Sequence, residues 1–429
     1  MRRGKRREPM FSQKGIALLM VTVGISIILS MAYEFDGSAL VDFEAASKAR
    51  DDMQMEFNVR SGMNLSQLLV RIQTQVLDKN RDALGGDPQI GDFTGFFLGF
   101  FGGDRQEVDD LAEAMGGFTE DTLKTLGVSN GRFDIQIGTE DGKINVNCAA
   151  DIQKQENLKS MIEALFYLQA YDPIFQNPAA DGWRRTREEQ AAAIVDYIDR
   201  DTSRVGQSGA AEQYGYESLR DRYLPKNQRI DTVGELKQVR GVDDRLWTLF
   251  GSAFTVYGPR GCTLNIGSVS DPNLIAAIIS LSAKNPEDPV VRDPQKLWAL
   301  ARRVSESSAP AGAGGFGAQW ANVQDFANFV KDPQGSLTAL FGQQSAQGLE
   351  PTGDVTDLGP AIAGVELDTQ KLSQIVSAGA RATYRVEVTA QVGNLTKRVV
   401  GVWDTQVVNQ NQRNPALTQG AWVYWREEQ

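Results

Sequence analysis

Four acidic side chains in the middle of the chain have the types and spacing of a metal site. They are Asp196, Asp199, Asp201 and Glu212. Asp196 and Asp199 stand three residues apart, so they share one face of the helix predicted there. Asp201 follows the end of that helix, and Glu212 returns across a glycine-containing loop. Hard oxygen ligands of this kind suit Ca²⁺, which takes about six to eight of them.

The calcium prediction has an alternative. The loop is no EF-hand, because Arg204 occupies the position where that motif requires glycine. The same four carboxylates also fit a solvated acidic face whose members cap helices. The sequence pattern is compatible with both interpretations.

Catalytic chemistry has no candidate residues. The chain contains no histidine, which removes the commonest general base, the commonest zinc ligand and any Ser-His-Asp triad. Carboxylate pairs can perform acid–base chemistry, but no base, nucleophile and orienting group gather at a suitable spacing. We therefore expect a protein that is not an enzyme.

The two cysteines, Cys148 and Cys262, are far apart in the sequence. An even pair in an oxidising compartment indicates a disulfide. Two buried free thiols are the alternative, and the membrane topology that the N-terminus predicts favours the disulfide.

The N-terminus combines a basic head with an apolar run over residues 16–33. A secretory signal peptide would be cut after such a run, behind small residues. Here the sharp boundary precedes the run, between Gly15 and Ile16. Cleavage there would remove the basic head and leave the apolar segment as the new N-terminus. An uncleaved signal anchor is the alternative.

The apolar run predicts a membrane-spanning helix, which needs about 20 residues. The basic head places the cytoplasm on its own side, so everything after Tyr33 is expected across the membrane. Helical spacing of apolar residues continues without a breaker. We predict one helix from about Ile16 to about Lys79, with its later part on a soluble domain.

The rest of the chain predicts an α+β fold with a helical middle. Residues 132–146 alternate as strand, turn and strand, residues 384–403 as a hairpin, and residues 422–425 as a last strand. Residues 143–147 and 263–267 are related, each an Asn-bearing strand end before a helix. The predicted parts are a leader (1–15), a spanning segment (16–33), a helix with the first strands (34–149), an inserted α-helical domain (150–345) and the strands completing the sheet (346–429).

The net charge of the chain indicates which classes of partner to expect. The net charge is −11, and the one basic cluster is the N-terminal head. We expect no nucleic-acid partner, because phosphate contacts supply most of that affinity.

Residues 93–103 are rich in phenylalanine and glycine. They would form a contact patch if exposed and part of a core if buried.

The chain resembles the minor pseudopilin K of type II secretion systems, the GspK family. The resemblance is carried by the leader, by Ile-Val-Asp-Tyr-Ile-Asp-Arg-Asp at residues 194–201, by Pro-Lys-Asn at 225–227 and by residues 233–241. It extends from Lys14 to the C-terminal strands. It implies a pilin-like domain carrying an inserted α-domain with SAM-like or helix-hairpin-helix elements. Some K pseudopilins resemble calcium-binding proteins in that domain.

The resemblance also implies a processing pathway and an assembly. Prepilin peptidase would cut between Gly15 and Ile16 and methylate Ile16. Most pilins carry glutamate at the fifth mature position, which here is Met20. The K family similarly lacks this glutamate and is thought to cap the pseudopilus tip. The expected partners are the minor pseudopilins I and J and, through them, H and the major pseudopilin. The globular part would face the periplasm, anchored in the inner membrane.

The sequence alone also allows two other functions. One is a minor type IV pilin that primes a surface pilus. The other is a membrane-anchored DNA-binding protein of the competence type, whose helix-hairpin-helix element at residues 233–249 would receive a phosphate with help from Arg240 and Arg245. The acidic neighbours of these arginines argue against the second function.

Overall fold

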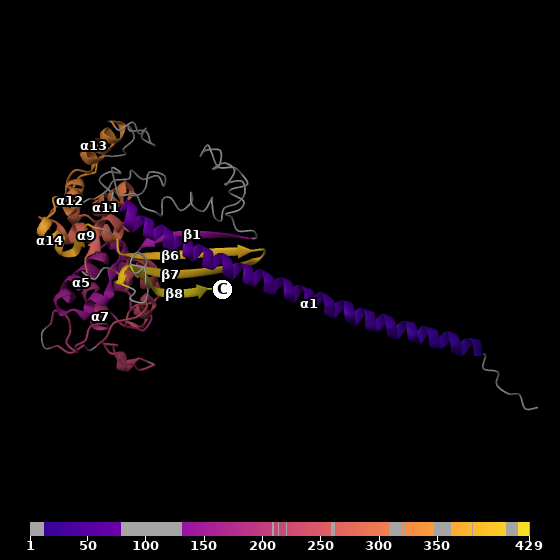
Figure 1. The fold of residues 1–429 in the computed structure, drawn as a ribbon. Coiled ribbons are helices and arrows are strands. Elements are labelled where there is room, and N and C mark those ends of the chain that lie inside the picture. The colour runs from indigo at the N-terminus through magenta and orange to yellow at the C-terminus, as the bar shows by residue number, and fades with distance from the viewer. Residues whose placement is uncertain are drawn as a thin grey trace, which may run out of the picture.

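A very long N-terminal helix leads into a globular body made of a sheet and a helical domain, as the computed structural model of the protein shows (Figure 1). The structure describes residues 13–78, 131–207, 210–212, 214–219, 221–258, 262–308, 320, 322–346, 362–379, 381–408 and 419–428. The phenylalanine-rich segment 93–103 lies outside these ranges.

The predicted N-terminal helix is confirmed. Helix α1 spans Gln13–Ile72 and continues as a π-helical turn, η1, over Gln73–Leu77. Its first half projects away from the body (Figure 1). An 18-residue window in it has a mean hydropathy of 2.3 with none of the window buried, so the helix is long and apolar enough to cross a membrane.

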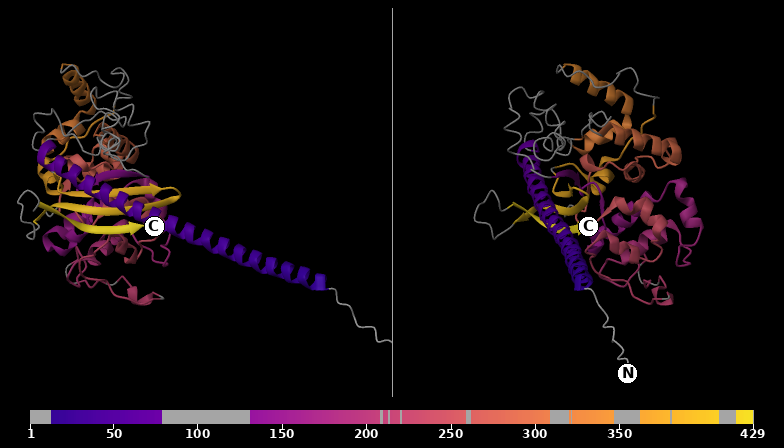
Figure 2. Two further views of the ribbon diagram at one scale, coloured as in Figure 1. Left: turned by 45° about the vertical axis from the view of Figure 1, so that its right-hand side comes forward. Right: turned by 90° about the vertical axis from the view of Figure 1, so that its right-hand side faces the viewer.

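The second half of α1 packs on a four-stranded antiparallel sheet. The strand order is β1-β6-β7-β8, and α1 crosses one face of the sheet (Figure 2). Apolar side chains of α1, such as Val59 and Leu69, share a core with Phe133 of β1 and Val388 of β6. The strands are β1 Arg132–Thr139, β6 Thr383–Val392, β7 Leu395–Val408 and β8 Gln419–Glu428. The predicted C-terminal hairpin and last strand are therefore confirmed.

The predicted strand, turn and strand over residues 132–146 are confirmed as β1, a turn and β2. β2 (Ile144–Asn145) does not pair with β1 but pairs in parallel with β3 (Phe254–Thr255). The turn between β1 and β2 is held by the start of β6, because the Asp141 carboxylate accepts hydrogen bonds from the backbone N–H groups of Ala382 and Thr383. The chain therefore leaves the sheet after β1 and enters the helical domain.

The helical domain consists of short helices around a core of its own. Its helices are η3 Val146–Ala150, α5 Ile152–Leu165, η4 Gln169–Tyr171, α6 Asp172–Gln176, α7 Arg187–Asp196, η5 Tyr216–Ser218, η6 Val233–Gln238, α8 Asp244–Phe250, η7 Gly251–Ala253, η8 Ile266–Ser268, α9 Pro272–Ser282, α10 Pro289–Arg292, α11 Pro294–Ser308, α12 Val323–Lys331, α13 Pro333–Ala346 and α14 Thr369–Ile375. It lies beside the C-terminal end of α1, away from the projecting half (Figure 1).

The two related Asn-bearing strand ends open the two halves of this domain. The side chain of Asn145 accepts a hydrogen bond from the N–H of Asn147 and caps η3. The side chain of Asn265, at the end of β4 (Leu264–Asn265), accepts one from Gly267 and caps η8. β4 pairs in parallel with β5 (Val376–Ser377), as β2 does with β3.

The core of the helical domain extends beyond the predicted range 150–345. At its beginning it includes Ile144 and Val146, and at its end Leu372 and Val376. The reason is that β2 pairs with β3 and β5 pairs with β4, so both flanks are tied to the helical domain rather than to the sheet. The sheet resumes at β6.

A buried charged junction connects the two parts. The guanidinium of Arg381 lies 4.0 Å from the carboxylate of Asp78, and both side chains are 3% exposed. Arg381 also donates to the hydroxyl of Ser268 and to the backbone oxygen of Gly267, each at 3.2 Å. The residue that ends η1, the segment just before β6 and the second half of the helical domain therefore meet at the Arg381 side chain.

Candidate metal centre

Helix α7 and the turn after it carry the first acidic residues of the site. α7 begins at a capping box formed by Thr186 and Glu189, in which the side chain of each residue accepts a hydrogen bond from the backbone N–H of the other. Its last residue is Asp196, and the chain turns through Tyr197 to Asp199. Asp196 and Asp199 are both completely buried.

A short loop brings Glu212 back to the end of α7. Ser203 and Ala211 form an antiparallel bridge, and the N–H of Arg204 donates to the oxygen of Ala210 at 2.8 Å. One carboxylate oxygen from each of Asp199, Asp201 and Glu212 then lies within 4.8 Å of the others. The structure thus brings together three of the four carboxylates that the sequence singled out.

Asn227 is a member of the site that the sequence analysis did not assign. Its side-chain Nδ2 donates to the backbone oxygen of Asp201 at 2.7 Å and to Oε2 of Glu212 at 3.2 Å. Its φ of 47° lies in the left-handed region, which asparagine tolerates better than most residues. Its place in Pro-Lys-Asn at 225–227 marks it as a turn residue, which carries no metal-ligand spacing.

Three buried oxygens at this site lack hydrogen bonds. Within the described residues, Oδ1 of Asp199, Oε1 of Glu212 and Oδ1 of Asn227 have no donor. Buried acceptors are almost always paired, so each exception needs an explanation. Two carboxylates and an amide oxygen form the hard donor set that Ca²⁺ prefers. The residues present therefore fit a calcium ion.

The electrostatics of the site favour a cation. Burial, reinforced by the charge of Glu212, raises the pKa of Asp199 to about 8. Burial, reinforced by Asp196, raises the pKa of Glu212 to about 7. These groups resist ionisation because they crowd together away from water. A divalent cation would offset the repulsion between these carboxylates, which without a cation favours their protonated forms.

Asp196 does not join the predicted ligand group. Its Oδ1 accepts a hydrogen bond from the N–H of Val205 at 3.0 Å, and its Oδ2 accepts one from the hydroxyl of Tyr214. Burial raises its pKa to about 6. Asp196 therefore holds the loop that carries Glu212, and both of its oxygens have donors.

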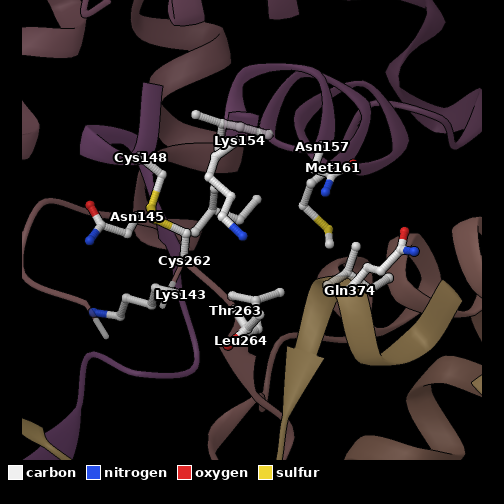
Figure 3. Close-up of a pocket in the computed structure, with 13 residues that line it drawn as sticks. Lys143, Asn145, Cys148, Lys154, Asn157, Met161, Cys262, Thr263, Leu264 and Gln374 are labelled. Carbon is white, nitrogen blue, oxygen red and sulfur yellow. A yellow bond between two sulfur atoms is a disulfide. The ribbon is translucent and has the colours of Figure 1, made fainter. Parts of the chain in front are cut away.

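Cys148 and Cys262 form a disulfide, which joins η3 to the segment before β4. Figure 3 shows this bond beside a small cavity, with Lys154 of α5 and Thr263 also lining it. The cavity volume is about 40 Å³. That is room for a few water molecules at most, so we assign no ligand to it.

The cations of the predicted helix-hairpin-helix element are used within the domain. Its two arms are η6 and α8, and the first is a 3₁₀ helix. Arg240 pairs with Asp181 at 3.3 Å and stacks on Trp183. Arg245 pairs with Asp243 at 2.6 Å. These pairs leave little positive charge for a phosphate.

The residues of the predicted leader boundary lie in the first turns of α1. Gly15 and Ile16 are exposed helical residues, and Met20 is 70% exposed. Cleavage after Gly15 and methylation of Ile16 stay predictions.

Taken together, the long apolar helix, the antiparallel sheet it crosses and the helices inserted between β1 and β6 define a pilin-like protein with an inserted α-domain. The predicted fold class is confirmed. A family model described as type II secretion system (T2SS), protein K, matches residues 142–258, which contain the whole candidate metal centre. The predicted resemblance to protein K of type II secretion systems is thereby confirmed, and these residues carry it.

Parts of this chain are similar to known proteins. The type II secretion system protein K of Aeromonas hydrophila is 25% identical over 191 residues, which are 40% of this chain. The match spans 56% of that relative's length. Among solved structures, the GspK-GspI-GspJ complex from the type 2 secretion system of enterotoxigenic Escherichia coli contains a chain similar to this one. The TM-score is 0.40 at 14% identity, over 70% of this chain and 81% of that chain.

Proposed function

We propose that this protein is a minor pseudopilin at the tip of a type II secretion pseudopilus, where it helps to initiate assembly and export across the outer membrane. One observation carries the proposal: a domain of the protein K family is inserted in a pilin-like fold behind a membrane-length helix. The role is structural, with no catalytic step.

The proposed topology follows from the N-terminus. Prepilin peptidase cuts between Gly15 and Ile16 and methylates Ile16, which leaves α1 in the inner membrane. The basic head supports a cytoplasmic leader and a periplasmic body. The disulfide between Cys148 and Cys262 suits that oxidising compartment.

The tip position is supported by two features of the chain. Met20 stands where most pilins have glutamate, so this subunit has no buried carboxylate for the N-terminal amine of a neighbour above it. The helical domain adds bulk at the end of α1 opposite its projecting half (Figure 1), where it would obstruct a further subunit. The proposed partners are the minor pseudopilins I and J, and through them H and the major pseudopilin.

The metal centre is proposed to bind Ca²⁺ through Asp199, Asp201, Glu212 and Asn227. The three unpaired buried oxygens support this assignment. The ion would supply positive charge that neutralises the crowded carboxylates. These residues would thereby hold the loop of residues 201–212 and the segment around Asn227 against the end of α7.

The test is the N-terminus of the full chain extracted from membranes, measured by mass spectrometry with and without prepilin peptidase. We expect a chain beginning at methylated Ile16 only when the enzyme is present. Co-purification with the I and J pseudopilins, lost in the absence of the enzyme, would place it in the pseudopilus. An intact Met1 in both samples would overturn the proposal.

A further inference from the structure

A side chain of helix α5 contacts the carboxylate cluster of the candidate metal centre. Gln155 lies on α5 and is 8% exposed. Its Nε2 donates to Oδ2 of Asp199 at 3.1 Å and to the backbone oxygen of Ala149 at 3.2 Å. Both hydrogens of the amide are therefore used, and the side chain bridges η3 and the acidic cluster.

This bridge determines which oxygen of Asp199 is available. Oδ2 accepts from Gln155, whereas Oδ1 is the oxygen without a donor among the described residues. A carboxylate held at one oxygen cannot rotate freely, so the other keeps a constant direction. Hydrogen bonds of this kind orient metal ligands throughout proteins.

The backbone oxygen of Ala149, to which Gln155 donates, lies in η3, and η3 is fixed to other parts of the domain. Ala149 is next to Cys148, whose disulfide to Cys262 ties η3 to the second half of the domain. The side chain of Asn147, also in η3, donates to the oxygen of Ile230 at 2.9 Å and accepts from its N–H at 2.9 Å. Gln155 thus connects Asp199 to a turn fastened at two points.

We propose that Gln155 is a positioning residue of the metal centre: it orients the Asp199 carboxylate for the cation without touching the cation itself. The inference rests on the proposed calcium site and deepens it. A purely structural role predicts something different, because a residue that only satisfies buried polar atoms would affect folding and leave metal affinity unchanged.

The test compares two glutamines of the same helix in the full chain, purified in detergent. Gln155→Met keeps the volume but removes both hydrogen bonds, and Gln153→Met changes an exposed side chain two residues away. Calcium affinity is measured by calorimetry. Tb³⁺ bound in place of calcium reports, through its luminescence lifetime, how many waters complete its coordination.

We expect Gln155→Met to weaken calcium binding about 10–100-fold, the usual effect of losing a ligand's supporting hydrogen bond, and to admit additional water at Tb³⁺. Gln153→Met should change neither. If Gln155→Met does not fold, Gln155→Asn, whose shorter amide cannot span both acceptors, should give the same result.

Each other outcome has a distinct meaning. Unchanged affinity and hydration in the Gln155 variant, with a lowered melting temperature before calcium is added, would overturn the positioning role and leave the calcium site intact. An equal loss in both variants would also overturn it. Absence of calcium binding in the unmodified chain would overturn the calcium site and this inference together.

Discussion

Calcium and pH should control the stability of the helical domain together. The perturbation is removal of calcium from the full chain in detergent with a chelator. At free calcium 100-fold above the dissociation constant, binding stabilises the folded state by about 2.7 kcal/mol. For a folded domain near the upper end of the range of about 150–250 residues, that stabilisation corresponds to a rise in melting temperature of about 5 °C. The stabilisation would come from the three buried oxygens of Asp199, Glu212 and Asn227, which have no hydrogen-bond donor among the described residues and would coordinate the ion.

The sign of the pH dependence follows from the raised pKa values. The pKa of Asp199 is raised to about 8 and that of Glu212 to about 7, whereas unfolded carboxyls titrate near about pH 4. Between these limits the folded state binds more protons than the unfolded state. The stability of the calcium-free protein therefore falls as pH rises from about 4 to about 8.

Calcium should reverse this trend, because the ligands must lose their protons to bind it. The melting-temperature gain on adding calcium is then larger near about pH 8 than near about pH 5. Thermal unfolding followed by circular dichroism, with and without calcium at both pH values, measures this. The control is Glu212→Gln, which removes one titrating ligand and should reduce both the calcium shift and the pH slope.

Two results would refute the reasoning. One is a calcium shift of the same size in Glu212→Gln as in the unmodified chain. The other is a calcium-free protein whose stability rises with pH over the same range, since that would mean the carboxylates are ionised and well paired without a metal.

Three further predictions concern the framework. Replacing both cysteines by serine should cost about 2–4 kcal/mol in the free energy of unfolding, since the disulfide closes a long loop; unchanged thermal stability would contradict this. Arg381→Met should cost about 3–5 kcal/mol because it leaves a buried carboxylate without its cation, whereas Arg302→Met, at an exposed pair, should cost under about 1 kcal/mol in denaturant unfolding. Gly62→Ala should destabilise by about 1–3 kcal/mol, because its new methyl group would lie 2.6 Å from Val388. Gly37→Ala, which meets nothing within 4 Å, should not lower the melting temperature.

Local patterns were sufficient for the regular elements. The helix of α1 and the hairpin of β6 and β7 follow from apolar periodicity and from the turn at Gly393, which need only near neighbours in the chain. The pairing of β2 was missed because its partner β3 lies more than a hundred residues away. The turn before it is held by the first residues of β6, which no local pattern reports.

The amino-acid sequence by itself determined the long apolar helix, the fold class, the family resemblance and three carboxylates of the candidate metal centre, because each depends on residue type and short spacing. Only the tertiary structure decided that Asn227 joins the cluster, that Asp196 instead holds the loop, and that Gln155 supports Asp199. The physical reason is that a hydrogen bond depends on direction and distance between atoms. Residues that are neighbours on one helix can turn their side chains to different partners, and residues distant in the chain can meet.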